Sequence, residues 1–488
     1  MNRVSNSTSI RKIETSSNSL KRNRSTYFLA LLFGFGASFA IAETPSKPNV
    51  LFIAIDDLNT RLGCYGFDHV SSPHIDKLAS EGIRFDKAYC QYPSCGPSRT
   101  SVLTGLRPQT TGMINNRMTF RELAPDAVTL PQLFLKNGYY TARVGKIFHQ
   151  RVPLDIGTSG SDDPASWSEA VNPIGRDKDE EQLMTIYTPQ LHISNTMGYL
   201  KANGSDAEQT DGKVADETIR LLEENKDKPF FIAAGFYRPH TPYIAPRKYF
   251  DRYDLDETQM PKLPAGYQDT VPASALSSTP EWPNFNTTEK EARECKLAYD
   301  ACISFVDAQV GRLLSAVDEL GLRENTIIVL WGDHGYHLGE HGLWRKNSLY
   351  EESARAPLII SSPGIATNAH DCERIVEFVD IYPTIADLAG LTPPNNIEGV
   401  SLRPLMEQPD AQWNRPAYIQ TLFVDVPGYS IRTDRWRYVE WGKQGDKGIE
   451  LYDQLNDPSE MNNLAGSEDH SKTIKRLRKL VLQNWGAK

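Results

Sequence analysis

The chain has 488 residues, of which 39% are hydrophobic and 24% charged, and its formal net charge is −9. This balance excludes a fibrous, collagen-like or disordered protein, and the length exceeds what one ordinary hydrophobic core supports. We therefore expect one large α/β domain and a smaller second one.

The first 42 residues have the pattern of a secretory signal peptide. Six basic residues and one acidic residue precede an apolar run over 27–40, and Ala40-Ile41-Ala42 supplies the small residues of a cleavage site. The run is shorter than the roughly 20 residues of a membrane-spanning helix, which disfavours an uncleaved anchor. We expect cleavage near Ala42 and export to the periplasm or the extracellular space.

Removal of this segment would change the formal net charge from −9 to −14. An acidic surface disfavours nucleic acid and stable association with anionic membranes, so an anionic substrate requires a local basic cluster. The six cysteines form neither an evident disulfide framework nor a Cys-x-x-Cys zinc pair. Cys295 and Cys302 lie about two turns apart on one predicted helix, too far to bridge each other.

Short continuous apolar runs are typical of strands buried on both faces of a parallel sheet. Helical patterns lie between them. A helix is predicted to begin at Pro73 after Ser72, and a 3.6-residue period predicts a helix from Thr288 to Leu320 that Gly321 ends. This alternation predicts a doubly wound, mostly parallel sheet. The predicted strands cover 48–57, 139–144, 229–235, 326–331 and 357–360.

The remaining segments differ in composition. Residues 151–211 and 252–287 are rich in Pro, Asp, Ser and Gly and are predicted to be long loops. After residue 405, short alternating segments predict antiparallel strands and a closing helix at 470–484. The predicted organisation is a signal peptide at 1–42, a large domain at 43–405 and a small antiparallel-sheet subdomain at 406–488, with strands at 418–422, 429–432, 436–441 and 450–452.

Charged and polar residues follow four predicted strands at the point where each strand ends. Ligands of open α/β sheets bind beyond the carboxyl ends of the strands. One such pair would have an ordinary structural explanation, but four at one edge indicate a functional site. The residues are Asp56 and Asp57, Lys146 and His149, Arg238 and His240, and Asp333 and His334.

Three of these residues, Asp56, Asp57 and Asp333, bring carboxylates to the same edge. Carboxylates this close repel one another unless a cation lies between them. Oxygen ligands favour Ca²⁺ or Mg²⁺ over zinc. The sequence therefore predicts a site for a hard divalent cation.

The most specific motif is Cys95-Gly96-Pro97-Ser98-Arg99, followed by Thr104-Gly105-Leu106-Arg107. It resembles the signature of the type I sulfatases, Cys-x-Pro-Ser-Arg and then Thr-Gly-x-Arg, at every defining position. The resemblance implies an alkaline-phosphatase-like fold and a maturation enzyme that oxidises Cys95 to formylglycine. It also implies one cation, Ca²⁺ before Mg²⁺, held by Asp56, Asp57, Asp333, the Cys95-derived oxygen and His334.

Over residues 48–465 the chain resembles the iduronate 2-sulfatase group. Residues 144–149 are similar to its Gly-Lys-x-x-His segment, and 238–242 to its basic-Pro-His-x-Pro segment, although Arg238 stands where Lys is commoner. Residues 332–346 are similar to its Asp-His-Gly and Gly-Glu-His-Gly-x-Trp-x-Lys block. Glu340 and His341 of this block are not assigned to the site.

The resemblance and the chemistry of sulfate ester hydrolysis together predict a role for each residue. Arg99 orients the hydrated formylglycine, and Lys146 and Lys346 stabilise sulfate oxygens. Asp333 also accepts the proton of the attacking hydroxyl. His240 protonates the leaving alcohol and His149 deprotonates the second hydroxyl.

The predicted function is removal of sulfate from a sulfated carbohydrate, with an exo-acting 2-O-sulfatase of uronic acids favoured. Arg99, Lys146, Arg238 and Lys346 are predicted to form its basic pocket. Sulfated galactans and ulvan-type glycans stay open, because the two long loops show no match. The alternatives are a phosphodiester or phosphonate monoester hydrolase on the same scaffold, and a non-catalytic sulfated-glycan binder if Cys95 is not oxidised.

Overall fold

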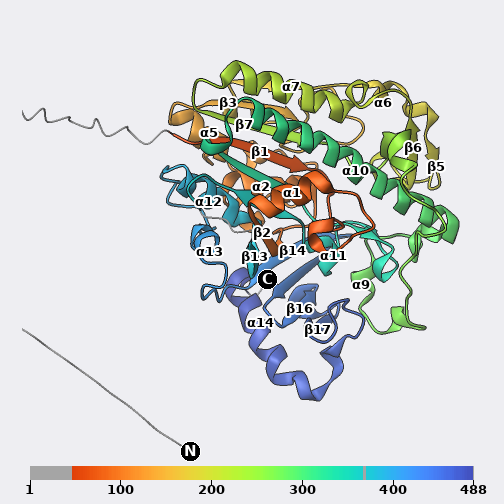
Figure 1. Ribbon diagram of the computed structural model, residues 1–488. Coiled ribbons are helices and arrows are strands. Elements are labelled where there is room, and N and C mark those ends of the chain that lie inside the picture. The colour runs from red at the N-terminus through yellow and green to blue at the C-terminus, as the bar shows by residue number, and fades with distance from the viewer. Residues whose placement is uncertain (1–46, 366–369, 487–488) are drawn as a thin grey trace, which may run out of the picture. The chain divides into compact units, whose positions relative to one another are not determined.

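The structure, a computed structural model, describes residues 47–365 and 370–486 (Figure 1). The predicted signal peptide lies outside these residues. Within them, an eight-stranded sheet has the order β13-β2-β12-β9-β1-β7-β3-β4, in which β12 alone runs antiparallel to its neighbours. The strands are β1 (Asn49–Ile55), β2 (Ile83–Tyr89), β3 (Tyr140–Gly145), β4 (Glu169–Val171), β7 (Phe230–Phe236), β9 (Thr326–Gly332), β12 (Leu358–Ser361) and β13 (His370–Glu377).

Strand β1 lies in the middle of this sheet and is buried on both faces. Leu51 and Ile53 pack into the core on one face, and Val50 and Phe52 pack into the core on the other. Strands β7 and β9 flank β1 in parallel register, as the uninterrupted apolar runs predict. The predicted doubly wound, mostly parallel sheet is confirmed.

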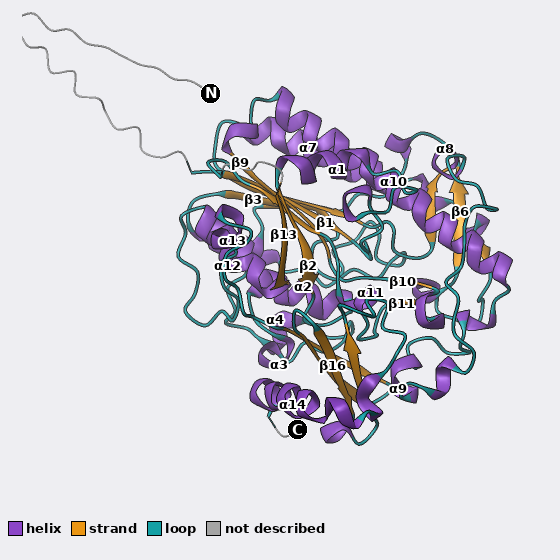
Figure 2. Ribbon diagram, turned by 60° about the horizontal axis from the view of Figure 1, so that its bottom comes forward, coloured by secondary structure: helices purple, strands orange, loops and turns teal. Residues whose placement is uncertain are grey.

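Helices cover both faces of the sheet (Figure 2). The longest, α10, begins at a capping box, in which the Thr288 hydroxyl accepts from the Glu291 N–H and the Glu291 carboxylate accepts from the Thr288 N–H. Gly321, with φ +66°, follows its end as predicted. One face carries α1 (Pro73–Glu81), α7 (Thr210–Asn225) and α10 (Glu289–Glu319), and the other carries α2 (Cys95–Thr104), α5 (Leu130–Lys136), α12 (Ile381–Leu388) and α13 (Arg403–Glu407).

The prediction of a long loop over 151–211 was wrong. This segment contains β4, which extends the main sheet, the short helix α6 (Arg176–Asp179), and the strands β5 (Thr185–Ile186) and β6 (Gly198–Ala202). β6 pairs with β8 (Tyr243–Pro246) in a separate small sheet. The strands have two to five residues, too few to show a clear periodicity. The second predicted loop, 252–287, contains only α9 (Ala273–Leu276) and 3-10 turns.

The C-terminal segment forms an antiparallel sheet, as predicted, and α14 (Ser471–Trp485) packs on it. Ile431, Tyr438 and Leu451 of the sheet share a core with Leu477 and Trp485 of the helix. The boundary between the two predicted domains stays a prediction. The strands are β14 (Ala417–Phe423), β15 (Val426–Arg432), β16 (Trp436–Trp441) and β17 (Ile449–Asp453).

All six cysteines are free thiols, including Cys295 and Cys302 on α10. In the described ranges 47–365 and 370–486, none of the helices combines the length and apolarity that crossing a bilayer requires.

Strands β3 and β7 pair glycine with glycine at their carboxyl ends, Gly145 opposite Gly235. Gly145 has φ +72°, and a Cβ atom there would lie 2.3 Å from the carbonyl oxygen of Gly235. The same carbonyl accepts from the backbone N–H of Lys146 at 3.0 Å. This contact sets the direction in which the chain leaves the sheet toward Lys146.

We predict that Gly145→Ala destabilises the fold more than Gly321→Ala does. Both positions have positive φ, which costs a non-glycine residue about 1–2 kcal/mol. Gly321 has φ +66° and no atom within 4 Å of an added Cβ, so it isolates the conformational cost. The midpoints of urea unfolding measure the difference. Equal midpoints for the two variants would show that the β3–β7 contact is not tight.

Candidate active site

The site lies where four neighbouring parallel strands end. The order β3-β7-β1-β9 places Lys146, His240, Asp57 and Asp333 beyond adjacent strand ends. Cys95 comes from the first residue of α2, on one face of the same sheet. These segments, far apart in sequence, meet because parallel strands direct their carboxyl ends to one edge.

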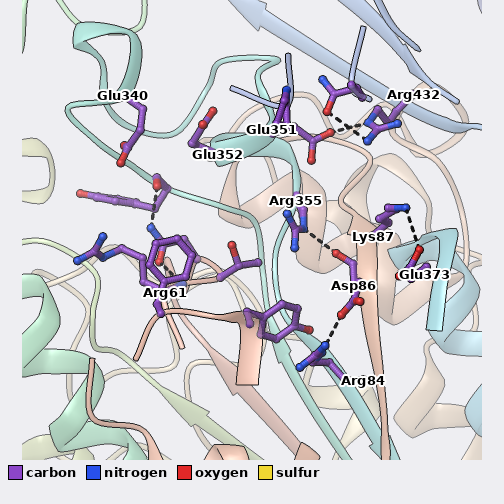
Figure 3. A pocket seen from close by; sticks show the side chains of 17 residues that line it. Arg61, Arg84, Asp86, Lys87, Glu340, Glu351, Glu352, Arg355, Glu373 and Arg432 are labelled. Atoms are coloured by element: carbon purple, nitrogen blue, oxygen red, sulfur yellow. Dashed lines mark hydrogen bonds and ion pairs between the residues drawn. The ribbon is translucent and has the colours of Figure 1, made fainter. Parts of the chain in front are cut away.

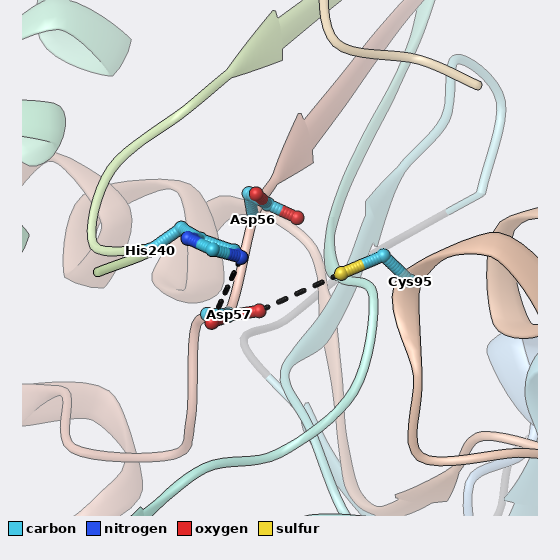
Figure 4. A group of neighbouring side chains, drawn as sticks. All are labelled: Asp56, Asp57, Cys95 and His240. Atoms are coloured by element: carbon cyan, nitrogen blue, oxygen red, sulfur yellow. Dashed lines mark hydrogen bonds and ion pairs between the residues drawn. The ribbon is translucent and has the colours of Figure 1, made fainter. Parts of the chain in front are cut away.

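Cys95 is fully buried and is surrounded by charged groups. Its Sγ lies 3.1 Å from Nζ of Lys346, 3.3 Å from Nε2 of His334 and 3.8 Å from Oδ1 of Asp57. Figure 4 shows Asp57 between Cys95 and His240, with Asp56 above it at the end of β1. Burial raises the pKa of the Cys95 thiol well above its ordinary value.

Asp57 is held in a left-handed backbone conformation, with φ +60°. Its N–H donates to Oδ1 of Asp333 at 2.9 Å, and its carbonyl accepts from the Tyr299 hydroxyl at 2.7 Å. Such a conformation persists only where the surroundings hold it, and it is common at functional sites. Sequence reasoning missed Tyr299, which lies among the apolar residues of α10 and has no motif of its own.

Arg99 connects the carboxylates rather than facing an open pocket. Its Nε donates to Asp333 at 2.8 Å and its Nη2 to Asp56 at 3.1 Å. Its Nη1 donates to the carbonyl of Lys146 at 2.6 Å. The side chain is fully buried, so the guanidinium holds three strand ends in position.

Two lysines supply the other positive charges of the site. Lys146 Nζ donates to Oδ2 of Asp56 at 2.5 Å, and Lys346 Nζ donates to Oδ1 of Asp57. Burial lowers the pKa of Lys346, but Asp57 and Cys95 outweigh burial and raise it above its ordinary value. Burial raises the pKa of Asp56 to about 7 although Lys146 opposes this effect. Both lysines lie where the sequence predicts them.

The two predicted proton-transfer histidines are almost completely buried. His240, 5% exposed, places Nε2 3.7 Å from Oδ2 of Asp57, and its Nδ1 lies 2.5 Å from the Thr241 carbonyl. His149 is 8% exposed, and neither ring nitrogen has a hydrogen-bond partner among the described residues. Burial and then the neighbouring lysines lower both pKa values well below that of free imidazole. Both rings are therefore neutral at neutral pH.

The donor set fits a divalent cation. Oδ2 of Asp57 is buried and has no hydrogen-bond partner among the described residues. A carboxylate oxygen in this state favours a cation beside it. Two overlapping groups of four residues each have ligand atoms within 4.8 Å of one another. The first group is Asp56, Asp57, Cys95 and His240, and the second is Asp57, Cys95, Asp333 and His334.

Arg238 does not join the predicted basic pocket. Its guanidinium donates to the carbonyls of His240 and Pro242, at 3.2 and 2.8 Å, and to Asp177 at 3.2 Å. It is 2% exposed, so it stabilises the segment that carries His240 instead of facing a substrate. Asp177 belongs to α6, inside the segment predicted to be a loop, and no feature of the sequence indicates this pairing.

Comparisons with known proteins identify the family of the chain. The family model described as "Sulfatase" matches residues 48–391. The chain belongs to the sulfatase family. A second model, "N-sulphoglucosamine sulphohydrolase, C-terminal", matches residues 339–485. The protein is therefore a sulfuric ester hydrolase. The family generally uses a formylglycine and a divalent metal, and Cys95 with its surrounding carboxylates fits both.

The similarity extends over most of the chain. A sulfatase of Formosa agariphila is 32% identical, with 90% of this chain and 87% of that protein covered. Iduronate 2-sulfatase of Mus musculus is also 32% identical, with coverage of 88% and 93%. A solved structure of BT4656 in complex with its substrate D-glucosamine-2-N,6-O-disulfate has a TM-score of 0.71, 26% identity, and coverage of 90% and 97%.

Proposed function

We propose that this protein is an exported, calcium-dependent sulfatase that releases sulfate from a sulfated sugar through a formylglycine at residue 95. The observation that carries the proposal is the position of Cys95. Its Sγ lies within 4 Å of Lys346, His334 and Asp57, at a fully buried position of the motif. The N-terminal sequence pattern supports export.

The formylglycine would supply a hydrated aldehyde oxygen that attacks sulfur, and a bound cation would supply positive charge to the sulfate oxygens. Asp56, Asp57, Asp333 and His334 would hold that cation. Ca²⁺ is preferred because carboxylate oxygens dominate this set, although the imidazole is an unusual ligand for so hard an ion.

The side chains of this protein can perform the remaining steps. Lys346 places its positive charge beside Sγ of Cys95, and Lys146 places its positive charge beside Asp56. Both charges would stabilise the oxygens of a bound sulfate. His149 is neutral, as a base that deprotonates the second hydroxyl must be. His240 would act as the acid for the leaving alcohol. A bound sulfate would raise its pKa by adding negative charge nearby.

We propose an exo-acting enzyme for 2-O-sulfated uronic acids or a related terminal sulfated sugar. The similarity to iduronate 2-sulfatase supports the uronic acid. The near-complete burial of Cys95, His149 and His240 supports a terminal sugar, because a narrow site admits a chain end more readily than the middle of a polymer. The sugar specificity resides outside the shared sulfate machinery, so this part of the proposal has its own test.

We predict that Cys95→Ala reduces turnover of an aryl sulfate by several orders of magnitude without unfolding the protein, because it removes the nucleophile. Cys90→Ala is the matched control, since Cys90 is equally buried but lies outside the motif. Mass spectrometry of the peptide that contains residue 95 should detect formylglycine in the wild type. Turnover by the Ala variant at the wild-type rate, or faster turnover of a phosphonate ester of the same chromophore, would contradict the proposal.

We predict that exhaustive chelation abolishes turnover and that Ca²⁺ restores it more fully than Mg²⁺ does. The carboxylates Asp56, Asp57 and Asp333 are hard oxygen ligands, and Oδ2 of Asp57 has no hydrogen-bond partner among the described residues. Asp57→Asn should lower the calcium content measured by elemental analysis. Full activity of chelated, metal-free enzyme would show that the acidic cluster holds no catalytic ion.

We predict that sulfate is released first from the non-reducing end of defined oligosaccharides that carry a 2-O-sulfated uronic acid. Product analysis by mass spectrometry gives the order of release. Loss of sulfate first from internal residues, or only from galactose 4- or 6-sulfates, would refute the proposed substrate and leave the sulfatase assignment intact.

A further inference from the structure

A second group of side chains, none of which has a role in the active site, brings together the buried His341 and Glu460 and the partly buried Glu352. His341 follows the short strand β10 (His337–Leu338), and Glu352 lies on α11 (Glu351–Ala354). Glu460 follows β17 of the C-terminal sheet. One atom from each of the three lies within 4.8 Å of the other two. The group therefore joins the catalytic part of the chain to the C-terminal segment.

The His341 ring has one satisfied and one unsatisfied nitrogen. Its Nδ1 lies 2.5 Å from the Tyr267 hydroxyl. Its Nε2 is buried and has no hydrogen-bond partner among the described residues, and the side chain is 0% exposed. A buried polar atom without a partner is rare in folded proteins and indicates a missing ligand.

The Tyr267 hydroxyl lies between the His341 ring and the Tyr350 hydroxyl. It donates to Tyr350 at 3.3 Å, so its oxygen can accept from Nδ1–H of His341. Nε2 then presents a lone pair toward the carboxylates. Metal-binding histidines have this arrangement, with the other ring N–H donated to a neighbouring group.

The two carboxylates beside this lone pair, Glu352 and Glu460, both have lone-pair sites left for a further ligand. Oε2 of Glu352 is buried and has no hydrogen-bond partner among the described residues. Oε1 of Glu460 accepts from Arg437 and Gln454, and Oε2 accepts from the backbone N–H of Glu351. A carboxylate has about four lone-pair sites, so Oε2 keeps one for a further ligand.

The spacing agrees with two ligands of one metal ion. Nε2 of His341 lies 3.6 Å from Oε2 of Glu352, which is too long for a hydrogen bond. Two ligands of a tetrahedral zinc ion with bonds of about 2.1 Å are roughly 3.4 Å apart. An imidazole nitrogen with two carboxylates is a ligand set that zinc and similar transition ions accept, whereas Ca²⁺ prefers oxygen alone.

We propose that His341, Glu352 and Glu460 form a second metal site, separate from the active site, that binds Zn²⁺ or a similar transition ion. The ion connects the segment after β10, α11 and the C-terminal segment, so its role is structural. Its three protein ligands leave a position for water.

A cavity of about 510 Å³ gives the ion a route to the site. Glu352 lines it, together with Glu340, Glu351 and Arg355 (Figure 3). The Glu352 side chain is 25% exposed, whereas that of His341 is fully buried. An ion can therefore reach Glu352 from solvent and be bound by the two buried ligands behind it.

The test uses the full-length purified protein, stripped with a chelator and refilled with excess Ca²⁺ to saturate the active site. Zn²⁺ is then added, the free ion is removed, and elemental analysis gives zinc per chain. We expect about one retained zinc in the wild type and at least about 100-fold weaker zinc binding in Glu352→Gln and His341→Gln. Co²⁺ should give visible absorption bands that the same variants lose.

Two matched variants complete the design. His337→Gln alters a neighbouring buried histidine that is hydrogen-bonded to Ser348, and it should retain zinc. Asp57→Asn alters the active site and should also retain zinc, which separates this result from the proposed catalytic mechanism. Glu352→Gln should keep sulfatase activity, which verifies its fold. Equal zinc retention in the wild type, Glu352→Gln and His341→Gln would overturn the proposal, as would loss of the zinc in Asp57→Asn alone.

Discussion

The structure depends on three buried carboxylates that can share one site only because three cationic side chains surround them. Asp56, Asp57 and Asp333 are each 0% exposed, and an isolated buried carboxylate would be strongly unfavourable. Arg99 joins Asp56 to Asp333, while Lys146 and Lys346 pair with Asp56 and Asp57. Removal of one partner from such a network leaves an uncompensated buried charge, which is the costly change.

This network also explains why the sheet is built as it is. Strands β1, β3 and β9 end where their next residues enter the network, and β7 lies between β1 and β3. The close contact at Gly145 and Gly235 brings the Lys146 carbonyl to Arg99. Arg99 is placed by α2, one turn after Cys95, so Cys95 and the network share one rigid element. The positions of the reactive groups are therefore a consequence of sheet order and of one helix start.

A second charged network joins the catalytic part of the chain to the C-terminal sheet. Arg432 and Arg437, from β15 and β16, both donate to Glu351 of α11. Glu460 accepts from Arg437 and from the backbone N–H of Glu351. The active-site network holds three carboxylates beside three cationic side chains, whereas here Glu352 lies beside the arginine-paired Glu351 and Glu460. In both places a buried polar atom without a partner lies among carboxylates, which is the physical basis for assigning a cation to each.

The sequence alone indicated the family, the motif that contains Cys95 and the residues that follow the central strands. The central strands were recognisable because burial on both faces requires continuous apolar residues, and the motif from Cys95 to Arg107 is long enough to be specific. Strands β2 and β13 carry charged residues such as Arg84 and Glu373, lie toward one edge of the sheet and show no such run, so only the fold revealed them.

Tertiary structure alone decided the direction of each side chain. Arg238 turns to Asp177, Tyr299 supports Asp57, and His341 meets Glu352 and Glu460, because partners far away in the chain compete for each polar group. Sequence spacing specifies which residues leave a strand end, but hydrogen-bond partners that only folding brings close determine where those residues point.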